Sequence, residues 1–170
     1  MRSLALSLIF LACFCAQAYG AQKMDVTPDI PAFQGFLRDE NQELGRLEEA
    51  LRGAAGGDGE CSLWREASTI VESYKKTMLI AAAVQDLLVS AVFVETNLSQ
   101  FNQYVWIRLN RMRLLAFSFL MEAQNALAYL ENNGPGDALP IFDAAVSRIQ
   151  TIHDAVKGME ARFAPLAAAP

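Results

Sequence analysis

Apolar residues recur at helical spacing in several stretches of the chain. The first of these contains Leu37, Leu44, Leu47 and Leu51, which follow one another at intervals of seven, three and four residues. This spacing places the four leucines on one face of a helix expected over residues 32–52. The helix is expected to end in the segment that follows, because four of residues 53–59 are glycines, whose backbone entropy opposes further helix.

A much longer stretch, from Ser62 to Asn133, contains neither glycine nor proline. Its length exceeds that of one compact helix, so we expect two helices joined by a turn at residues 95–99, with a single continuous rod as the alternative. Ser62 is expected to cap the first of these helices, and Asn97 or Ser99 the second. Two apolar stripes support this division: Trp64, Ala67, Val71, Tyr74, Met78, Ala81, Gln85, Leu88 and Val92, then Val105, Leu109, Met112, Ala116, Phe119, Ala123, Ala126 and Leu130.

The last helix is marked most clearly at both ends. Residues 132–136 contain two glycines and a proline and cannot continue a helix, whereas Pro140 suits the first turn of a new one. Ala164 and Pro165 are expected to end that helix, which leaves residues 165–170 as a flexible tail. Its apolar positions step by three and four residues: Phe142, Ala145, Ile149, Ile152, Val156, Met159 and Phe163.

These helices, with short connections and no strand-like alternation, predict the fold class. We expect an all-α protein in which residues 32–164 form an antiparallel up-down-up-down four-helix bundle. The two central helices would make a long hairpin. Residues 21–31, with Pro28 and Pro31 and no periodicity, are expected to form an extended N-terminal arm.

The first twenty residues have the pattern of a secretory signal peptide. A positive start at Arg2 precedes an apolar run from Leu4 to Ala16, and small residues follow up to Gly20. Cleavage is expected after Gly20, or after Ala18, and the protein would be exported to a periplasmic or extracellular compartment. Lipid attachment at Cys13 is the alternative, which the phenylalanine at position 10 disfavours.

Composition narrows the function classes further. The chain has 170 residues, of which 53% are hydrophobic and 19% charged, and a formal net charge of −5. One domain is expected, and the acidic balance argues against nucleic acid as a partner. Removal of residues 1–20 would leave Cys61 as the single thiol, either buried and inert or part of an intermolecular disulfide.

Candidate chemistry is sparse. The chain has one histidine, His153, no serine elbow and no phosphate-binding loop, so we expect a protein that is not an enzyme and has no cofactor. One alternative is an exported bundle that carries haem between His153 and a methionine. Another is a bundle that holds an apolar ligand in a cavity near four small side chains, Ala81, Ala116, Ala123 and Ala126.

The two central helices carry more apolar residues than one buried stripe requires. In the second half of the first, an additional stripe comprises Ile80, Val84, Leu87, Ala91 and Val94, and in the next helix Ile107, Leu114 and Met121 recur every seven residues. A helix that is apolar nearly all round is covered on several sides or contacts another molecule. Because the flanking helices are expected to be shorter, the hairpin end would project by about 10 Å.

Three interpretations of this surplus remain open: the arm folds over the hairpin end, the end is a protein interface, or it contacts a membrane surface. The interface and the membrane interpretations both require Leu87, Val94, Ile107 and Leu114 to be exposed, and the interface is the leading hypothesis for function. The expected function is therefore binding of a protein partner or a second copy, with Asp86 paired to Arg108 across the hairpin. The expected contact residues are Leu87, Val94, Phe101, Tyr104, Trp106, Ile107, Arg111 and Leu114.

Overall fold

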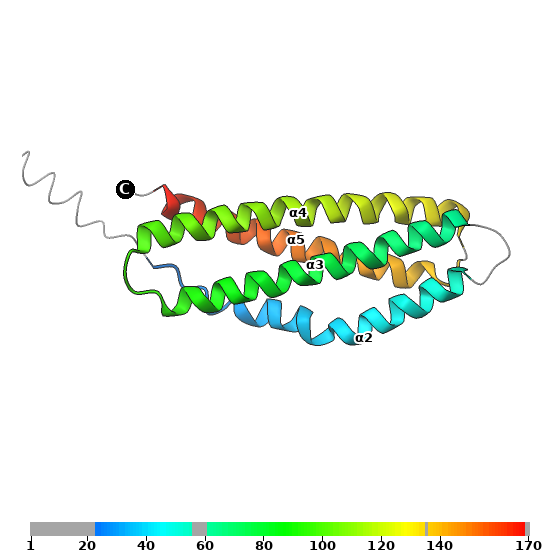
Figure 1. The fold of residues 1–170 in the computed structure, drawn as a ribbon, viewed down its shortest axis with the longest axis horizontal. Helices are drawn as coiled ribbons and strands as arrows, with labels where there is room; N and C mark the ends of the chain where they lie inside the picture. Colours follow the sequence, from blue (N-terminus) through cyan, green and yellow to red (C-terminus); the bar gives the residue numbers. More distant parts are fainter. Residues whose placement is uncertain (1–22, 56–60, 135, 169–170) are drawn as a thin grey trace, which may run out of the picture.

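Four α-helices make up the regular structure of the described part of the chain (Figure 1). The computed structural model describes residues 23–55, 61–134 and 136–168, and within these ranges it contains no strand. The helices are α2 (Ile30–Ala55), α3 (Cys61–Phe93), α4 (Leu98–Asn133) and α5 (Leu139–Ala167). The expected all-α class is confirmed, whereas the proposed signal peptide lies outside the described residues.

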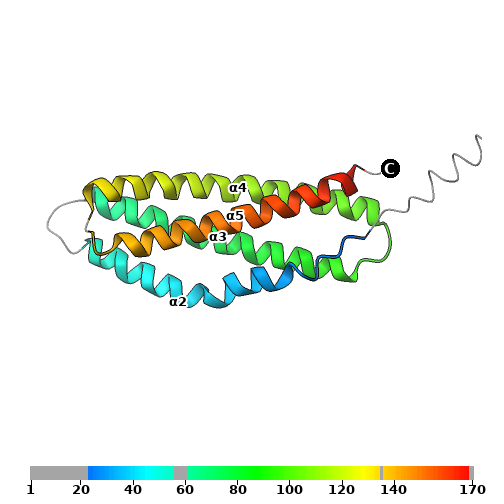
Figure 2. The same ribbon diagram turned by 180° about the vertical axis from the view of Figure 1, so that it is seen from behind.

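The helices lie side by side as a bundle around α3. Within the described residues α3 contacts α2, α4 and α5, while α2 and α4 lie on opposite sides and do not touch. The turn between α3 and α4 lies at the same end of the bundle as residues 23–29 and the last turns of α5 (Figures 1 and 2). One end of the molecule therefore brings together three segments that are far apart in sequence.

The long glycine-free stretch forms two helices, as expected, and the single rod is wrong. Helix α3 ends at Phe93 and α4 begins at Leu98, with Asn97 at the N-cap position. The capping mechanism differs from the expectation, because the Asn97 side chain makes no cap hydrogen bond. Asn97 instead adopts a left-handed conformation with φ 54°, and its carbonyl accepts the hydrogen bond of the Phe101 amide at 3.0 Å. Ser62 lies within α3 and is not its N-cap.

Helix α5 extends further than the sequence suggested. It reaches Ala167 and includes Pro165 in its last turn, so the expected end of the helix at Ala164 and Pro165 is wrong. Proline lacks an amide hydrogen, but the helical path continues past it, and the Ala168 amide donates to the Ala164 carbonyl at 3.2 Å. This extension carries α5 to the turn between α3 and α4 (Figure 2).

Most positions of both apolar stripes of α3 are buried, and Trp64 and Val92 at the ends of the first stripe are 47% and 36% exposed. The additional stripe was expected to be surplus, yet Ile80 is 7% exposed, Val84 0%, Leu87 9% and Ala91 5%. Among the described residues, α3 is the one helix whose length and composition would allow it to cross a membrane. Because 44% of its most apolar window is buried inside the bundle, the same composition suits a core helix enclosed by its neighbours.

Two leucines on α3 provide a matched test of this packing. Leu88 is 0% exposed and Leu79 is 69% exposed. We expect Leu88→Ala to lower the free energy of unfolding by about 3 kcal/mol, because it removes a fully buried side chain and leaves a cavity. Leu79→Ala should change it by less than about 0.5 kcal/mol. Urea denaturation followed by circular dichroism measures both, and equal effects would contradict the described burial.

Candidate interaction surface

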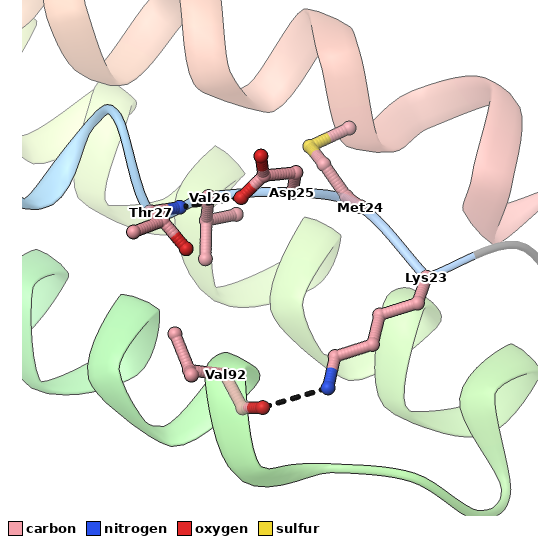
Figure 3. Close-up of a pocket in the computed structure, with 6 residues that line it drawn as sticks. All are labelled: Lys23, Met24, Asp25, Val26, Thr27 and Val92. Atoms are coloured by element: carbon pink, nitrogen blue, oxygen red, sulfur yellow. Dashed lines mark hydrogen bonds between the residues drawn. The ribbon is translucent and has the colours of Figure 1, made fainter.

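The N-terminal arm covers the end of the α3–α4 hairpin. Val26 is 1% exposed, and Figure 3 shows Met24, Val26 and Lys23 arranged along an extended segment that crosses the end of α3. The Lys23 ammonium donates a 2.6 Å hydrogen bond to the Val92 carbonyl, in the last turn of α3. A cation at this position interacts favourably with the negative end of the helix dipole and with a carbonyl that has no partner inside the helix.

Helix α5 holds the other end of the arm. Arg162 donates two hydrogen bonds to the Asp29 carboxylate, at 2.7 and 2.8 Å, and a third to the Asp25 carbonyl at 3.1 Å. A guanidinium bound to both carboxylate oxygens fixes orientation as well as distance. The structure thus favours the interpretation in which the arm folds over the hairpin end, where Val26 and Leu87 are buried, while Val92 and Phe93 remain 36% and 77% exposed.

The hollow beside the arm is shallow and has a small set of polar groups. It has a volume of about 310 Å³ and is lined by Lys23, Met24, Asp25, Val26, Thr27 and Val92 (Figure 3). Lys23 is bonded to Val92, and the Asp25 carboxylate accepts a hydrogen bond from the Thr27 amide at 3.0 Å. The polar groups of this hollow therefore stabilise the arm itself.

The residues expected to form an interface differ widely in exposure. Leu87 is a core residue at 9% exposure, so its expected place on the surface is wrong. The expectation assumed that a bundle helix buries only one stripe. Because α3 has neighbours on three sides, it buries the stripe of Leu87 as well. Three further members are half-buried: Val94, Phe101 and Trp106. The exposed members all lie on α4: Tyr104, Ile107, Arg111 and Leu114.

An exposed apolar row runs along the side of α4 that faces away from the core. We call Ile107, Leu114 and Met121 the outer row; they recur every seven residues and are 38%, 52% and 40% exposed. Leu115 and Phe117, at 52% and 47%, widen the row near its centre. They were absent from the expected contact set, although the sequence from residue 114 to 121 contains a single polar residue, Ser118.

Charged side chains lie along the α3-facing edge of the outer row. Arg108 lies over the Tyr104 ring, with 6.0 Å between the guanidinium carbon and the ring centroid. The expected ion pair between Asp86 and Arg108 is not among those formed by the described residues, although both side chains line one hollow between α3 and α4. Glu122 lines a second hollow with residues of α3.

On the opposite edge, the ion pair of Arg113 and Glu160 ties α4 to α5, with 2.8 Å between Nε and Oε2. His153 of α5 lies nearby and is 6% exposed, with its ring centroid 5.7 Å from that of Phe117. Its Nδ1 lies 3.0 Å from Asp154 Oδ1. The hydrogen bond from Gln150, and then that with His153, hold the pKa of the Asp154 carboxyl below its ordinary value. The imidazole is therefore buried between Phe117 and the Asp154 carboxylate.

No group of three or more metal-ligating side chains gathers within the described ranges. Four small side chains near which a ligand cavity was expected are at most 1% exposed: Ala81, Ala116, Ala123 and Ala126. The surface hollows around Lys23, Trp64, Gln124 and Asp86 are lined by none of these alanines. Small side chains at such positions allow neighbouring helices to approach closely.

A buried phenol lies among charged residues between α2, α3 and α5. Tyr74 is 1% exposed, and its hydroxyl has no hydrogen-bond partner. Burial raises the pKa of Tyr74 above its ordinary value of 10.0, and the nearby positive charge of Arg148 partly opposes this effect. Arg148 itself pairs with Glu43 at 3.1 Å, so α5 is tied to α2 at this level of the bundle.

The chain matches no family model, no curated protein and no solved structure. The outer row of α4 is an exposed apolar surface that no element of the described chain covers.

The arm offers a test of its contribution. Val26→Asp places a charge at a site that is 1% exposed, so we expect the arm to detach from the bundle. Hydrogen exchange of the Asp29 amide, which is bonded to the Val26 carbonyl at 3.0 Å, should then accelerate by about tenfold or more. Thr27→Asp, at an exposed neighbouring position, is the control. Unchanged exchange in the Val26 variant would show that the arm does not depend on this contact.

The buried phenol predicts a pH dependence at alkaline pH. Because the pKa of Tyr74 is higher in the folded chain than its ordinary value of 10.0, the unfolded chain loses this proton first. The stabilisation is fully present below pH 10 and is lost as pH rises through the folded pKa. We expect Tyr74→Phe to reduce the loss of stability above pH 10. Urea denaturation across this range checks it, with Tyr104→Phe, an exposed position, as the control; the same alkaline loss in both variants would contradict the assignment.

Proposed function

We propose that this protein is an exported, non-enzymatic helical bundle that acts by binding another protein molecule through the outer face of α4. In this proposal the chain has the antiparallel up-down-up-down topology, with α3 and α4 as its central hairpin. Export rests on the pattern of residues 1–20. The proposal puts the interface on the side of α4 because the arm packs over part of the hairpin end, where Leu87 is buried.

The observation that carries the proposal is the outer row. Ile107, Leu114 and Met121 keep the seven-residue spacing that suits packing against another helix, and all three are more than a third exposed. Elsewhere on α4 the buried positions already satisfy contact with α3 and α5. The outer row therefore stabilises the core no more than polar residues at these positions would. Burial against a partner would instead remove its apolar area from water.

The neighbouring side chains have the composition of a binding surface. Tyr104 and Phe117 supply aromatic area beside the row, and Arg111 is exposed at its edge. Aromatic residues and arginine are enriched at protein interfaces because they combine large contact area with polar or charged groups at the rim. Glu122 on the same helix and the formal net charge of −5 favour a protein partner over an anionic membrane surface.

A matched pair of substitutions tests the proposal. Leu114→Glu introduces a charge at the centre of the outer row, while Leu79→Glu does the same at an exposed leucine on α3. We expect Leu114→Glu to weaken association by about 30-fold or more, which corresponds to loss of a central contact residue, and Leu79→Glu to have little effect. The size of the complex in extracts of the native compartment, measured by native electrophoresis, reports binding, and circular dichroism reports helicity.

Two outcomes would contradict the proposal. One is a complex of unchanged size in the Leu114 variant, which would place the interface elsewhere. The other is loss of helicity in the Leu114 variant alone, which would show that Leu114 supports the fold and not a partner.

A further inference from the structure

We infer that the outer row binds a second copy of this chain, with the two α4 helices antiparallel and Leu114 at the two-fold axis. This inference rests on the proposed function and adds the identity and orientation of the partner. The row is symmetric about its centre, because Ile107 lies seven residues before Leu114 and Met121 seven residues after it. In an antiparallel pair Leu114 meets Leu114 of the second copy, and Ile107 meets Met121.

Charge along α4 favours the antiparallel orientation over the parallel one. The exposed charges before Leu114 are positive, Arg108 and Arg111, and the first exposed charge after it is negative, Glu122. Neither Arg111 nor Glu122 takes part in the ion pairs given for the described residues. In a two-fold parallel pair the α3 edge of one copy would lie opposite the α5 edge of the other, so the arginines and Glu122 would not meet. Antiparallel helices place arginine near glutamate on the same edge.

The three charges also lie on a common edge of the helix. Arg108 lines one hollow with α3 residues and Glu122 lines another, so both side chains are on the α3 side of the outer row. A two-fold axis perpendicular to α4 keeps the α3 sides of the two copies together. With Leu114 on the axis, Arg108 faces position 120 of the second copy, two residues from Glu122, which is about 3 Å along the helix.

The outer face is accessible to such a partner. No contact joins α2 to α4 within the described ranges, and in Figures 1 and 2 α4 lies along an edge of the bundle with no other helix beyond it. The seven-residue spacing predicts a crossing angle of about 20° between the paired helices, as in left-handed helix packing. From Tyr104 to Gln124 the contact would extend for about 30 Å.

Cysteine cross-linking tests the orientation directly. In a full chain with Cys13, Cys15 and Cys61 replaced by serine, Leu114→Cys should form a covalent dimer under mild oxidation at least about tenfold faster than Leu79→Cys. Ile107→Cys and Met121→Cys should cross-link poorly alone but efficiently when the two variants are mixed. Efficient self-cross-linking of the Ile107 variant, or no excess over the Leu79 variant at any position, would overturn the antiparallel pair.

A photoreactive amino acid at position 114, activated in the native compartment, separates failure of this inference from failure of the proposed function. An adduct of twice the chain mass supports both. An adduct with a different protein overturns the self-pairing and leaves the proposed function standing. An adduct with lipid, or no adduct, overturns both.

Discussion

The fold depends on the need to enclose α3, a helix that is apolar on nearly every side. Buried positions on this helix extend from Ala67 to Ala91 and include most of both apolar stripes. One neighbouring helix can cover one stripe, so α3 requires α2, α4 and α5 together. The same requirement explains the arm, since Val26 covers the end of the hairpin where α2 no longer runs beside it. Apolar burial around one central helix thus determines where the other elements lie.

Burial of α3 leaves α4 in a different situation. Its inward positions, such as Leu109 and Ala116, pack against α3 and α5, but no element of the described chain covers its outer row. Much of the exposed apolar area of the described residues therefore lies on the side of this helix, and Phe93, 77% exposed, adds to it at the end of the hairpin. The ion pair of Arg113 with Glu160 ties α4 to α5 at one edge, and packing against α3 supports the other edge. A rigid, exposed row of this kind suits association without refolding.

Much of the fold could be predicted from the sequence, because periodicity reports which faces of a helix are apolar and glycine or proline clusters report where helices end. The helices and the turn near Asn97 follow from such signals. The element that covers each apolar face cannot be predicted in this way, because it depends on contacts between residues that are far apart in sequence. Arg162 and Asp29 are 133 positions apart, and the arm has no periodic pattern from which its packing could be predicted. For the same reason Leu87 was assigned to the surface, while Ile107 and Leu114 were correctly expected to be exposed.

The central claim is that the outer row of α4 is covered by a partner when the protein is in its own compartment. The rate of methionine oxidation by peroxide tests this claim directly, because Met121 is 40% exposed in the single chain and Met112 on the same helix is 8% exposed. The account predicts that Met121 is oxidised about tenfold more slowly in the native compartment than in dilute purified protein, while Met112 is oxidised slowly in both. Equal rates for Met121 in the two settings would contradict it.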